Sequence, residues 1–289
     1  MSLHRPYVLN VIAEDARFLS GDLKRLGAPV FLSDTAFDIE IAHDGLAALA
    51  EARAITKGAR ADINLVRGEG RRKKLLVADM DSTIIGCECL DELADMAGLK
   101  PKVAAITERA MRGEFAFEPA LRERVGLLKG LKLEALARVY AERVRLNGGA
   151  RILLATMRRN GAHTILVSGG FTYFTSRVAR DAGFDENKGN TLIDDGSALT
   201  GEVGEPILGR EAKLSTLEKA ASERGLSVSD AVAVGDGAND LDMIKRAGLG
   251  VAYRAKPVVA EAAGASIAHG DLTSLLYLQG YRESDFVRP

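Results

Sequence analysis

Two aspartates separated by one residue follow a short apolar run in the first third of the chain. Residues 74–78 have the pattern of a buried parallel strand, and Asp79, Asp81, Ser82 and Thr83 come soon after it. Such a cluster is also typical of a helix N-cap or a turn, because Asp, Ser and Thr all serve there. In an open α/β sheet, however, ligands bind at the carboxyl ends of the strands. The pattern therefore places two carboxylates where such a fold binds its ligand.

Two later apolar runs are followed by polar groups in the same way. Residues 164–167 run into Ser168, Gly169 and Gly170, whose hydroxyl and exposed amides could cradle a phosphate at a helix N-terminus. Residues 231–234 run into a glycine loop that carries Asp236, Asn239 and Asp240, and such hard oxygen ligands suit Mg²⁺. Lys213 lies near the start of a predicted helix, where its charge opposes the dipole; taken alone it would be a surface lysine.

The elements around these groups alternate between strand and helix. Similar apolar runs occupy residues 74–78, 164–167, 231–234 and 248–252, and helical patterns occupy 151–159, 172–182, 211–224 and 241–246. This alternation predicts an α/β fold, a doubly wound Rossmann-like parallel sheet. The interval 80–163 is far longer than the about 30 residues of a βαβ unit, and its helical spacing indicates an inserted helical cap. We expect the cap at residues 86–148 and the core at 71–85 and 149–289.

The first seventy residues form a separate unit in the sequence. A polar, glycine-bearing linker at residues 67–70 follows predicted strands at 7–12, 30–41 and 62–66 and predicted helices at 18–26 and 45–55. The result is a small α+β domain at residues 1–70 that loosely resembles ACT-type regulatory modules but carries no clear ligand signature. All the polar strand ends lie after it, so we expect it to be dispensable for chemistry.

Composition excludes several classes of protein. Lys plus Arg number 39 and Asp plus Glu number 40 among 289 residues, a net charge of −1 that gives no case for nucleic-acid or anionic-membrane binding. The basic run at residues 71–74 is interpreted as a solvated approach to the first strand. No stretch approaches the ~18 apolar residues of a membrane span, and no signal peptide is expected. The two cysteines, Cys87 and Cys89, are too close together to staple the fold, which favours packing roles and a cytoplasmic protein.

Taken in order, the four polar segments resemble the signature motifs of the haloacid dehalogenase-like phosphatase superfamily over residues 73–266. The order also distinguishes them from response-regulator receivers, in which an acidic pair precedes the phosphoacceptor. The resemblance implies Asp79 as nucleophile and Asp81 as general acid and then general base. It further implies that Mg²⁺ is held by Asp79, the backbone carbonyl of Asp81 and Asp236. Asp240 and Asn239 would order Lys213 or metal-bound water. Ser168, Gly169 and Lys213 would contact the phosphoryl oxygens.

The resemblance narrows to the phosphoserine phosphatases, because Glu88 follows the first motif and Arg124 lies in the segment Leu-Arg-Glu-Arg-Val. It implies that Glu88 meets the substrate ammonium, that Arg124 meets its carboxylate, and that Met111 and Phe117 face the substrate from the cap. From the residues alone, Met111 and Phe117 would be cap core. The implied activity is Mg²⁺-dependent hydrolysis of phosphoserine in serine biosynthesis. Two alternatives stay open: a phosphatase or phosphotransferase that acts on another small phosphorylated metabolite, and a non-enzymatic amino-acid sensor.

Overall fold

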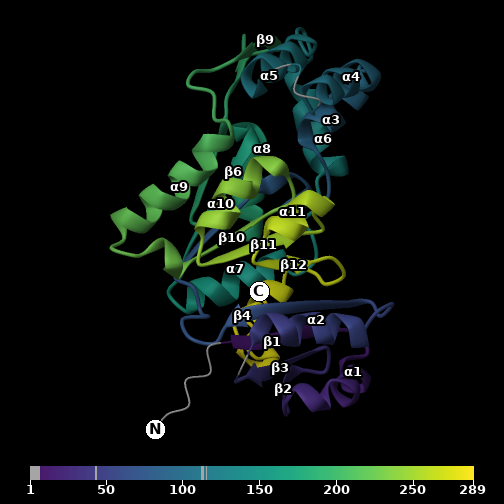
Figure 1. Ribbon diagram of the computed structural model, residues 1–289. Coiled ribbons are helices and arrows are strands. Elements are labelled where there is room, and N and C mark those ends of the chain that lie inside the picture. Colours follow the sequence, from purple (N-terminus) through teal and green to yellow (C-terminus); the bar gives the residue numbers. More distant parts are fainter. Residues whose placement is uncertain (1–6, 43, 112–113, 115) are drawn as a thin grey trace.

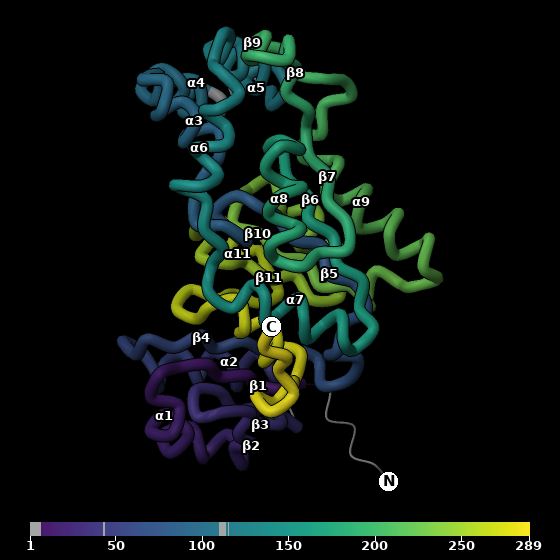
Figure 2. Tube along the Cα trace, turned by 180° about the vertical axis from the view of Figure 1, so that it is seen from behind, coloured from purple at the N-terminus to yellow at the C-terminus, as the bar shows by residue number. Residues whose placement is uncertain are grey.

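The computed structural model describes residues 7–42, 44–111, 114 and 116–289, with side chains left aside at 110 and 111. Three bodies follow one another along the long axis of the molecule. A helical cap lies at one end, an α/β core in the middle, and the N-terminal unit at the other end (Figure 1). The view from behind shows the same order, so the cap and the N-terminal unit are held apart by the core (Figure 2).

The core is a parallel sheet of six strands in the order β12-β11-β10-β5-β6-β7. Its strands are β5 (Leu75–Ala78), β6 (His163–Phe171), β7 (Glu186–Asn190), β10 (Ala231–Gly235), β11 (Leu249–Tyr253) and β12 (Ala265–Ile267). The chain winds outward from β5 to β7, then returns to the other side of β5 at β10. Ligand sites in such sheets form where the winding reverses, which here is between β5 and β10.

Helices cover both faces of this sheet, as expected of a doubly wound fold. On one face lie α9 (Arg210–Glu223), α10 (Leu241–Arg246) and α11 (Pro257–Ala262), and on the other α7 (Ala150–Arg159) and α8 (Thr172–Ala182). Alternate residues of β5 serve the two faces. Leu75 and Val77 pack with α9 and α10, and Leu76 and Ala78 pack with α7 and α8. Such a strand is apolar throughout, which explains the run that marks it in the sequence.

The inserted segment folds as four helices, α3 (Cys89–Met96), α4 (Lys100–Met111), α5 (Phe117–Gly126) and α6 (Leu133–Arg143). Pro101 and Pro119 lie in the first turns of α4 and α5, where a missing N–H costs no helical hydrogen bond. The chain crosses between core and cap twice, and the two crossings pair with each other through an antiparallel bridge of Ile85 and Leu146.

A hairpin of β8 (Leu192–Asp194) and β9 (Leu199–Val203) leaves the core and reaches the cap (Figure 1). Backbone hydrogen bonds join the Gly130 N–H to the Leu199 carbonyl at 2.8 Å and the Leu199 N–H to the Leu131 carbonyl at 2.9 Å. The sequence pattern predicts no strand here, because each strand of the hairpin is short and no local pattern indicates its partner. A segment that follows the third core strand thus braces the cap.

The N-terminal unit is an antiparallel sheet in the order β2-β3-β1-β4. Its elements are β1 (Tyr7–Ala13), α1 (Ala16–Asp22), β2 (Pro29–Ser33), β3 (Ala36–Ile41), α2 (Gly45–Ile55) and β4 (Ala61–Arg67). The single strand-like segment predicted at 30–41 is in fact a hairpin, with a turn stabilised by the Thr35 N–H donating to Ser33 Oγ. The helix predicted at 18–26 ends at Asp22 and continues only as a short 3-10 turn.

Buried polar groups join this unit to the core. The Asp62 carboxylate accepts hydrogen bonds from the backbone N–H groups of residues 268–270, which follow β12. The Asn64 side chain pairs with both backbone groups of Ser266. Asp38 receives two guanidinium nitrogens of Arg71, at 2.6 and 3.2 Å. The N-terminal unit is therefore fixed to the sheet edge by matched donors and acceptors.

The expectation of a solvated basic run at residues 71–74 is wrong for two of its members. Arg71 pairs with Asp38 and also donates to the Tyr277 and Leu278 carbonyls. Lys73 is only 8% exposed, and its ammonium donates to the carbonyls of Gly70 and Ser229. The donors that the run supplies meet acceptors far away in sequence, which a local charge pattern does not reveal.

Among the described residues, no helix combines the length and the apolar character needed to span a membrane.

Candidate active site

A cavity of about 540 Å³ lies between the cap and the carboxyl ends of β5, β6 and β10. The core contributes Asp79, Asp81, Ser168, Gly169, Asp236 and Asn239 to its lining, and the cap side contributes Glu88, Phe117 and Arg124. Lys213 and Asp240 lie beneath the floor, in contact with Asp79 or near it. The structure thus brings together every site residue named from the sequence except Met111, whose side chain is outside the described part.

Asp79 ends β5 and turns its carboxylate into the floor of the cavity. Its Oδ1 accepts a hydrogen bond from the Met80 N–H at 2.8 Å and forms an ion pair with Lys213 Nζ, also at 2.8 Å. Burial raises the pKa of Asp79 well above its usual value, the nearby Asp240 carboxylate raises it further, and Lys213 opposes the shift. With Oδ1 engaged, Oδ2 is the oxygen left to act on a ligand.

Lys213 is a buried cation between two carboxylates. It comes from the first turn of α9 and is 2% exposed, with Nζ 2.6 Å from Asp240 Oδ1. Burial alone would lower the pKa of Lys213, but Asp79 and Asp240 outweigh it and raise the pKa. The Asp240 side chain packs directly against the backbone of Gly235 at the end of β10, because a Cβ at Gly235 would lie 2.3 Å from the Asp240 carboxyl carbon. A side chain at residue 235 would therefore displace the anchor of Lys213.

Three carboxylates form a group that could hold a metal ion. One oxygen from each of Asp79, Asp236 and Asp240 lies within 4.8 Å of the others. Burial and the Asp240 charge raise the pKa of Asp236, whose Oδ1 accepts a hydrogen bond from Thr83 Oγ1 at 3.2 Å. These raised pKa values reflect the cost of gathering like charges, and a hard divalent cation would relieve it. The donor set fits Mg²⁺ in type.

The Asp81 side chain points away from that group. Its Oδ1 accepts from the Cys89 N–H at 2.9 Å and its Oδ2 from Ser168 Oγ at 3.1 Å. Burial raises the pKa of Asp81 although both hydrogen bonds oppose the shift. A carboxyl group that holds its proton more tightly than usual beside a reactive carboxylate suits acid–base chemistry.

Ser168, Gly169 and Gly170 do not lie at a helix N-terminus, contrary to the sequence expectation. They continue β6, whose pairing with β7 is irregular between Val167 and Phe171, and α8 begins only at Thr172. The bulge turns the Ser168 hydroxyl and the Gly169 backbone into the cavity. The ring of Phe117 packs on this backbone, because a Cβ at Gly169 would lie 3.1 Å from its Cζ. A glycine is needed where the cap touches the core.

Glu88 enters the cavity from the segment that leads into α3. Its Oε1 accepts a hydrogen bond from Ser82 Oγ at 2.6 Å. Glu88 stays in contact with solvent, but crowding by the protein around the cavity partly desolvates it, and together with the Asp81 charge this raises the pKa of Glu88 to about 7. The ionised form would gain from a cationic ligand group in the cavity.

Arg124 faces the cavity from α5. Its Nε donates to the Ala120 carbonyl at 3.2 Å and its Nη1 to Thr107 Oγ1 at 3.4 Å. Burial lowers the pKa of Arg124, and no carboxylate within the described ranges forms an ion pair with it. A half-buried guanidinium with neutral partners can bind an anionic ligand group without first losing another anion.

Four further residues support the site, although no role in it was assigned to them from the sequence. Ser82 holds Glu88 and Thr83 holds Asp236. Asn190 donates to the Gly169 and Leu208 carbonyls and so fixes the bulge. Lys256 lines the cavity where its backbone N–H meets the Asp236 carbonyl. Only Ser82 and Thr83 had a signal, their place beside Asp81; the other two become neighbours of the site through the fold.

Comparison with known proteins gives a family and relatives for this arrangement. A family model described as haloacid dehalogenase-like hydrolase matches residues 76–245. A protein of Archaeoglobus fulgidus named phosphoserine phosphatase is 46% identical over 205 residues, which cover 71% of this chain. The chain spans 59% of the length of that relative. The resemblance stated from the motifs is thus confirmed across the core and the cap.

Solved structures extend the likeness. A probable phosphoserine phosphatase from Vibrio cholerae has a TM-score of 0.81 at 31% identity, and the match covers 99% of this chain and 90% of that one. A phosphoserine phosphatase carrying an analogue of the phospho-aspartyl intermediate has a TM-score of 0.66 at 40% identity, over 71% of this chain and 98% of that one. The match to the Vibrio cholerae structure therefore includes the N-terminal unit.

Proposed function

Since the chain belongs to the haloacid dehalogenase-like hydrolases, we propose that it hydrolyses O-phospho-L-serine to L-serine and phosphate, the last step of serine biosynthesis. The observation that carries this substrate is the pair Glu88 and Arg124 in one cavity with Asp79 and Asp81. The names of the relatives support the same choice.

The substrate has three charged groups, and the cavity offers a complement to each. Arg124 meets the carboxylate with its planar fork, and Glu88 meets the ammonium. Phe117 closes the cap over the apolar carbon between them. Ser168, the Gly169 amide and Lys213 receive the phosphoryl oxygens, where charge must be stabilised in the transition state. The family resemblance also implies that Met111 lies on this cap surface, and that implication stays a prediction.

Hydrolysis proceeds in two balanced steps. The free oxygen of Asp79 forms a bond to phosphorus while the bond from phosphorus to the serine oxygen breaks, and Asp81 gives that oxygen its proton. Asp81 then takes a proton from water, whose oxygen bonds to phosphorus and releases Asp79 and inorganic phosphate. The raised pKa of Asp81 supports the first role, because the group must carry a proton near neutral pH.

Mg²⁺ is the proposed cofactor, held by Asp79, Asp236 and the backbone carbonyl of Asp81. When bound, it neutralises the gathered carboxylates and polarises the phosphoryl group. Asp240 keeps Lys213 in place through the 2.6 Å ion pair, and Asn239 lies at the cavity wall where it can order the phosphoryl group or metal-bound water. The two free cysteines are consistent with a reducing compartment, and we place the reaction in the cytoplasm.

Phosphate release from a matched substrate panel tests the proposal. Phosphoserine is compared with phosphoethanolamine, which lacks the carboxylate, with 3-phosphoglycerate, which lacks the ammonium, and with p-nitrophenyl phosphate, which lacks both. We expect the highest kcat/KM for phosphoserine and loss of activity on all four after chelation, restored by Mg²⁺. Equal kcat/KM across the panel would refute the substrate, and undiminished activity after exhaustive chelation would refute the cofactor.

A further inference from the structure

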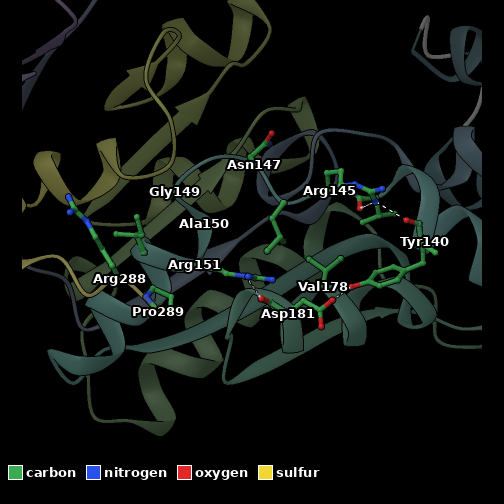
Figure 3. Close-up of a pocket in the computed structure, with 14 residues that line it drawn as sticks. Tyr140, Arg145, Asn147, Gly149, Ala150, Arg151, Val178, Asp181, Arg288 and Pro289 are labelled. Atoms are coloured by element: carbon green, nitrogen blue, oxygen red, sulfur yellow. Dashed lines mark hydrogen bonds between the residues drawn. The ribbon is translucent and has the colours of Figure 1, made fainter.

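A second cavity, of about 620 Å³, lies where the cap joins the core (Figure 3). Its volume is within the about 300–1,000 Å³ typical of small-molecule sites. The cap contributes Tyr140 and Val144, the returning crossing contributes Arg145 and Leu146, and α7 and α8 contribute Arg151 and Asp181. None of these residues lines the catalytic cavity. We call this space the hinge cavity.

The walls of the hinge cavity combine apolar surface with positive charge. Val144, Leu146, Ile152 and Val178 supply apolar surface. The Arg145 side chain donates to the carbonyls of residues 141 and 144, and the Arg151 side chain donates to the Asp181 carbonyl. Within the described chain, neither arginine forms an ion pair with a carboxylate. The cavity therefore offers two guanidinium groups beside an apolar surface.

The acidic side chain in the lining, that of Asp181, already accepts hydrogen bonds from neighbouring side chains. The Asp181 carboxylate accepts from Tyr140 Oη at 2.6 Å and from Arg180 Nε at 2.9 Å, which lowers the pKa of Asp181. Arg288, also in the lining, pairs with Glu283 at 2.5 Å. Figure 3 shows the Tyr140–Asp181 bond and the Arg151 contact side by side. The charge left for a ligand is thus that of Arg145 and Arg151, and it favours an anion.

Two successive hydrogen bonds connect the hinge cavity to the catalytic floor. Asn147, in the lining, donates its side-chain N–H to the Thr83 carbonyl at 2.8 Å. Thr83 Oγ1 in turn donates to Asp236. Because Tyr140 lies on the cap and Asp181 on the core, any change in the angle between the two bodies also changes the walls of this cavity.

We propose that the hinge cavity binds a small organic anion, an acidic group attached to an apolar body, and that its occupancy changes phosphatase activity by fixing the angle of the cap. A ligand that contacts both bodies binds one cap angle better than another and shifts the population toward it. By linkage, ligands of the catalytic cavity change the affinity of the hinge cavity by the same factor.

The first test measures binding with 2-naphthoate as probe and 2-naphthamide as its neutral control. The chain has no tryptophan, so naphthalene fluorescence is read without indole background. We expect saturable binding of 2-naphthoate, weakened at least about tenfold in the amide and in Arg145→Glu and Arg151→Glu. Arg159→Glu, on an exposed position of the same helix α7, is the matched control and should bind within about twofold of wild type.

The second test measures the effect on catalysis. Saturating 2-naphthoate should change kcat/KM for p-nitrophenyl phosphate at least about twofold in wild type and in Arg159→Glu, and leave it unchanged in Arg145→Glu and Arg151→Glu. Arg151→Gln serves if charge reversal prevents folding. No saturable binding, equal affinity in all variants, or saturation with unchanged kcat/KM would each overturn the proposal. The binding result stands apart from substrate identity, so failure of phosphoserine as substrate is a separate finding.

Discussion

Buried carboxylates occur in two regions of this molecule, and their partners differ. At the junction with the N-terminal unit, Asp62 accepts four backbone hydrogen bonds and Asp38 receives a two-nitrogen contact from Arg71. In the catalytic floor, Asp79 and Asp240 share Lys213 and each accepts one backbone N–H, from Met80 and Gly237, while Asp236 accepts the Thr83 hydroxyl. The first set is fully paired, whereas the second gathers three carboxylates around one lysine. Burial with full pairing fixes two bodies together, whereas carboxylates gathered with too little positive charge stay reactive and ready for a cation.

The largest expected effect comes from removing the proposed nucleophile. Asp79→Asn should lower kcat by about 10⁴-fold or more, since an amide cannot form the covalent intermediate. The melting temperature should be unchanged or higher, because one of the facing carboxylates is gone. Phosphate release and thermal melting measure the two effects. Turnover close to wild type by a protein verified to be free of deamidation would rule out the covalent route.

A smaller loss, confined to one substrate, is expected at the cap. Arg124→Ala should lower kcat/KM for phosphoserine, with a loss of transition-state binding free energy of about 2 to 4 kcal/mol. This is the scale for leaving a charged partner unpaired. Hydrolysis of p-nitrophenyl phosphate should be nearly unaffected. Arg122→Ala is the control, since Arg122 is an exposed residue of the same helix paired with Glu205. Equal losses on both substrates would instead assign Arg124 to cap folding or to the phosphoryl group.

The junction should show the opposite pattern. Asp62→Ala leaves the N–H groups of residues 268–270 without their acceptor and should lower the free energy of unfolding by about 2 to 3 kcal/mol. The kcat/KM for phosphoserine should stay within about threefold, because the cavity is on the far side of the core. Urea unfolding and initial rates provide the two numbers. Asp34→Ala, which breaks an exposed ion pair, should cost less than about 0.5 kcal/mol.

A loss of activity without a loss of stability in Asp62→Ala would contradict the view that the junction stabilises the fold and the catalytic floor performs the chemistry. Such a result would mean that the N-terminal unit contributes to the site. The point substitution is a sharper test than deletion of residues 1–70, since deletion also removes Asp38 from Arg71 and exposes the sheet edge at once.

The smallest effect concerns pH. The pKa of Glu88 is raised to about 7, so the group gains a proton and loses its negative charge as the pH falls below that value. Binding of the substrate ammonium weakens accordingly. The ratio of kcat/KM for phosphoserine to that for p-nitrophenyl phosphate should fall up to about tenfold per pH unit below 7. In Glu88→Gln the ratio should be low and independent of pH, and a flat ratio in wild type between pH 8 and 5.5 would exclude this role.

The catalytic floor could be located from the sequence because its carboxylates and Ser168 follow recognisable strands, whereas Lys213, on helix α9, depended on the family resemblance. Asp79, Ser168 and Asp236 are each close to the end of an apolar run, and the geometry of a parallel sheet brings such ends together. The doubly wound fold followed from the same pattern. Glu88 and Arg124 depended on family resemblance, because helical spacing does not say which face of a cap helix meets the cavity.

The remaining features depend on contacts that span the chain. Asp62 meets residues more than two hundred positions away, and Asn190, at the end of β7, reaches the Gly169 carbonyl in the neighbouring strand β6. Neither contact leaves a local pattern. The left-handed backbone of Ser82, with φ of 55°, is likewise unexpected for a serine, yet it belongs to the turn that brings the hydroxyl to Glu88.

The hairpin of β8 and β9 determines how this molecule can be recombined. A chimera that exchanged only residues 86–148 for the cap of a relative would leave the hairpin behind, with Leu199 facing a foreign helix pair and its two hydrogen bonds to residues 130 and 131 unmatched. The contact between hairpin and cap would then join residues from two different proteins that do not match each other. The transplantable unit is discontinuous: the four helices together with residues 192–203.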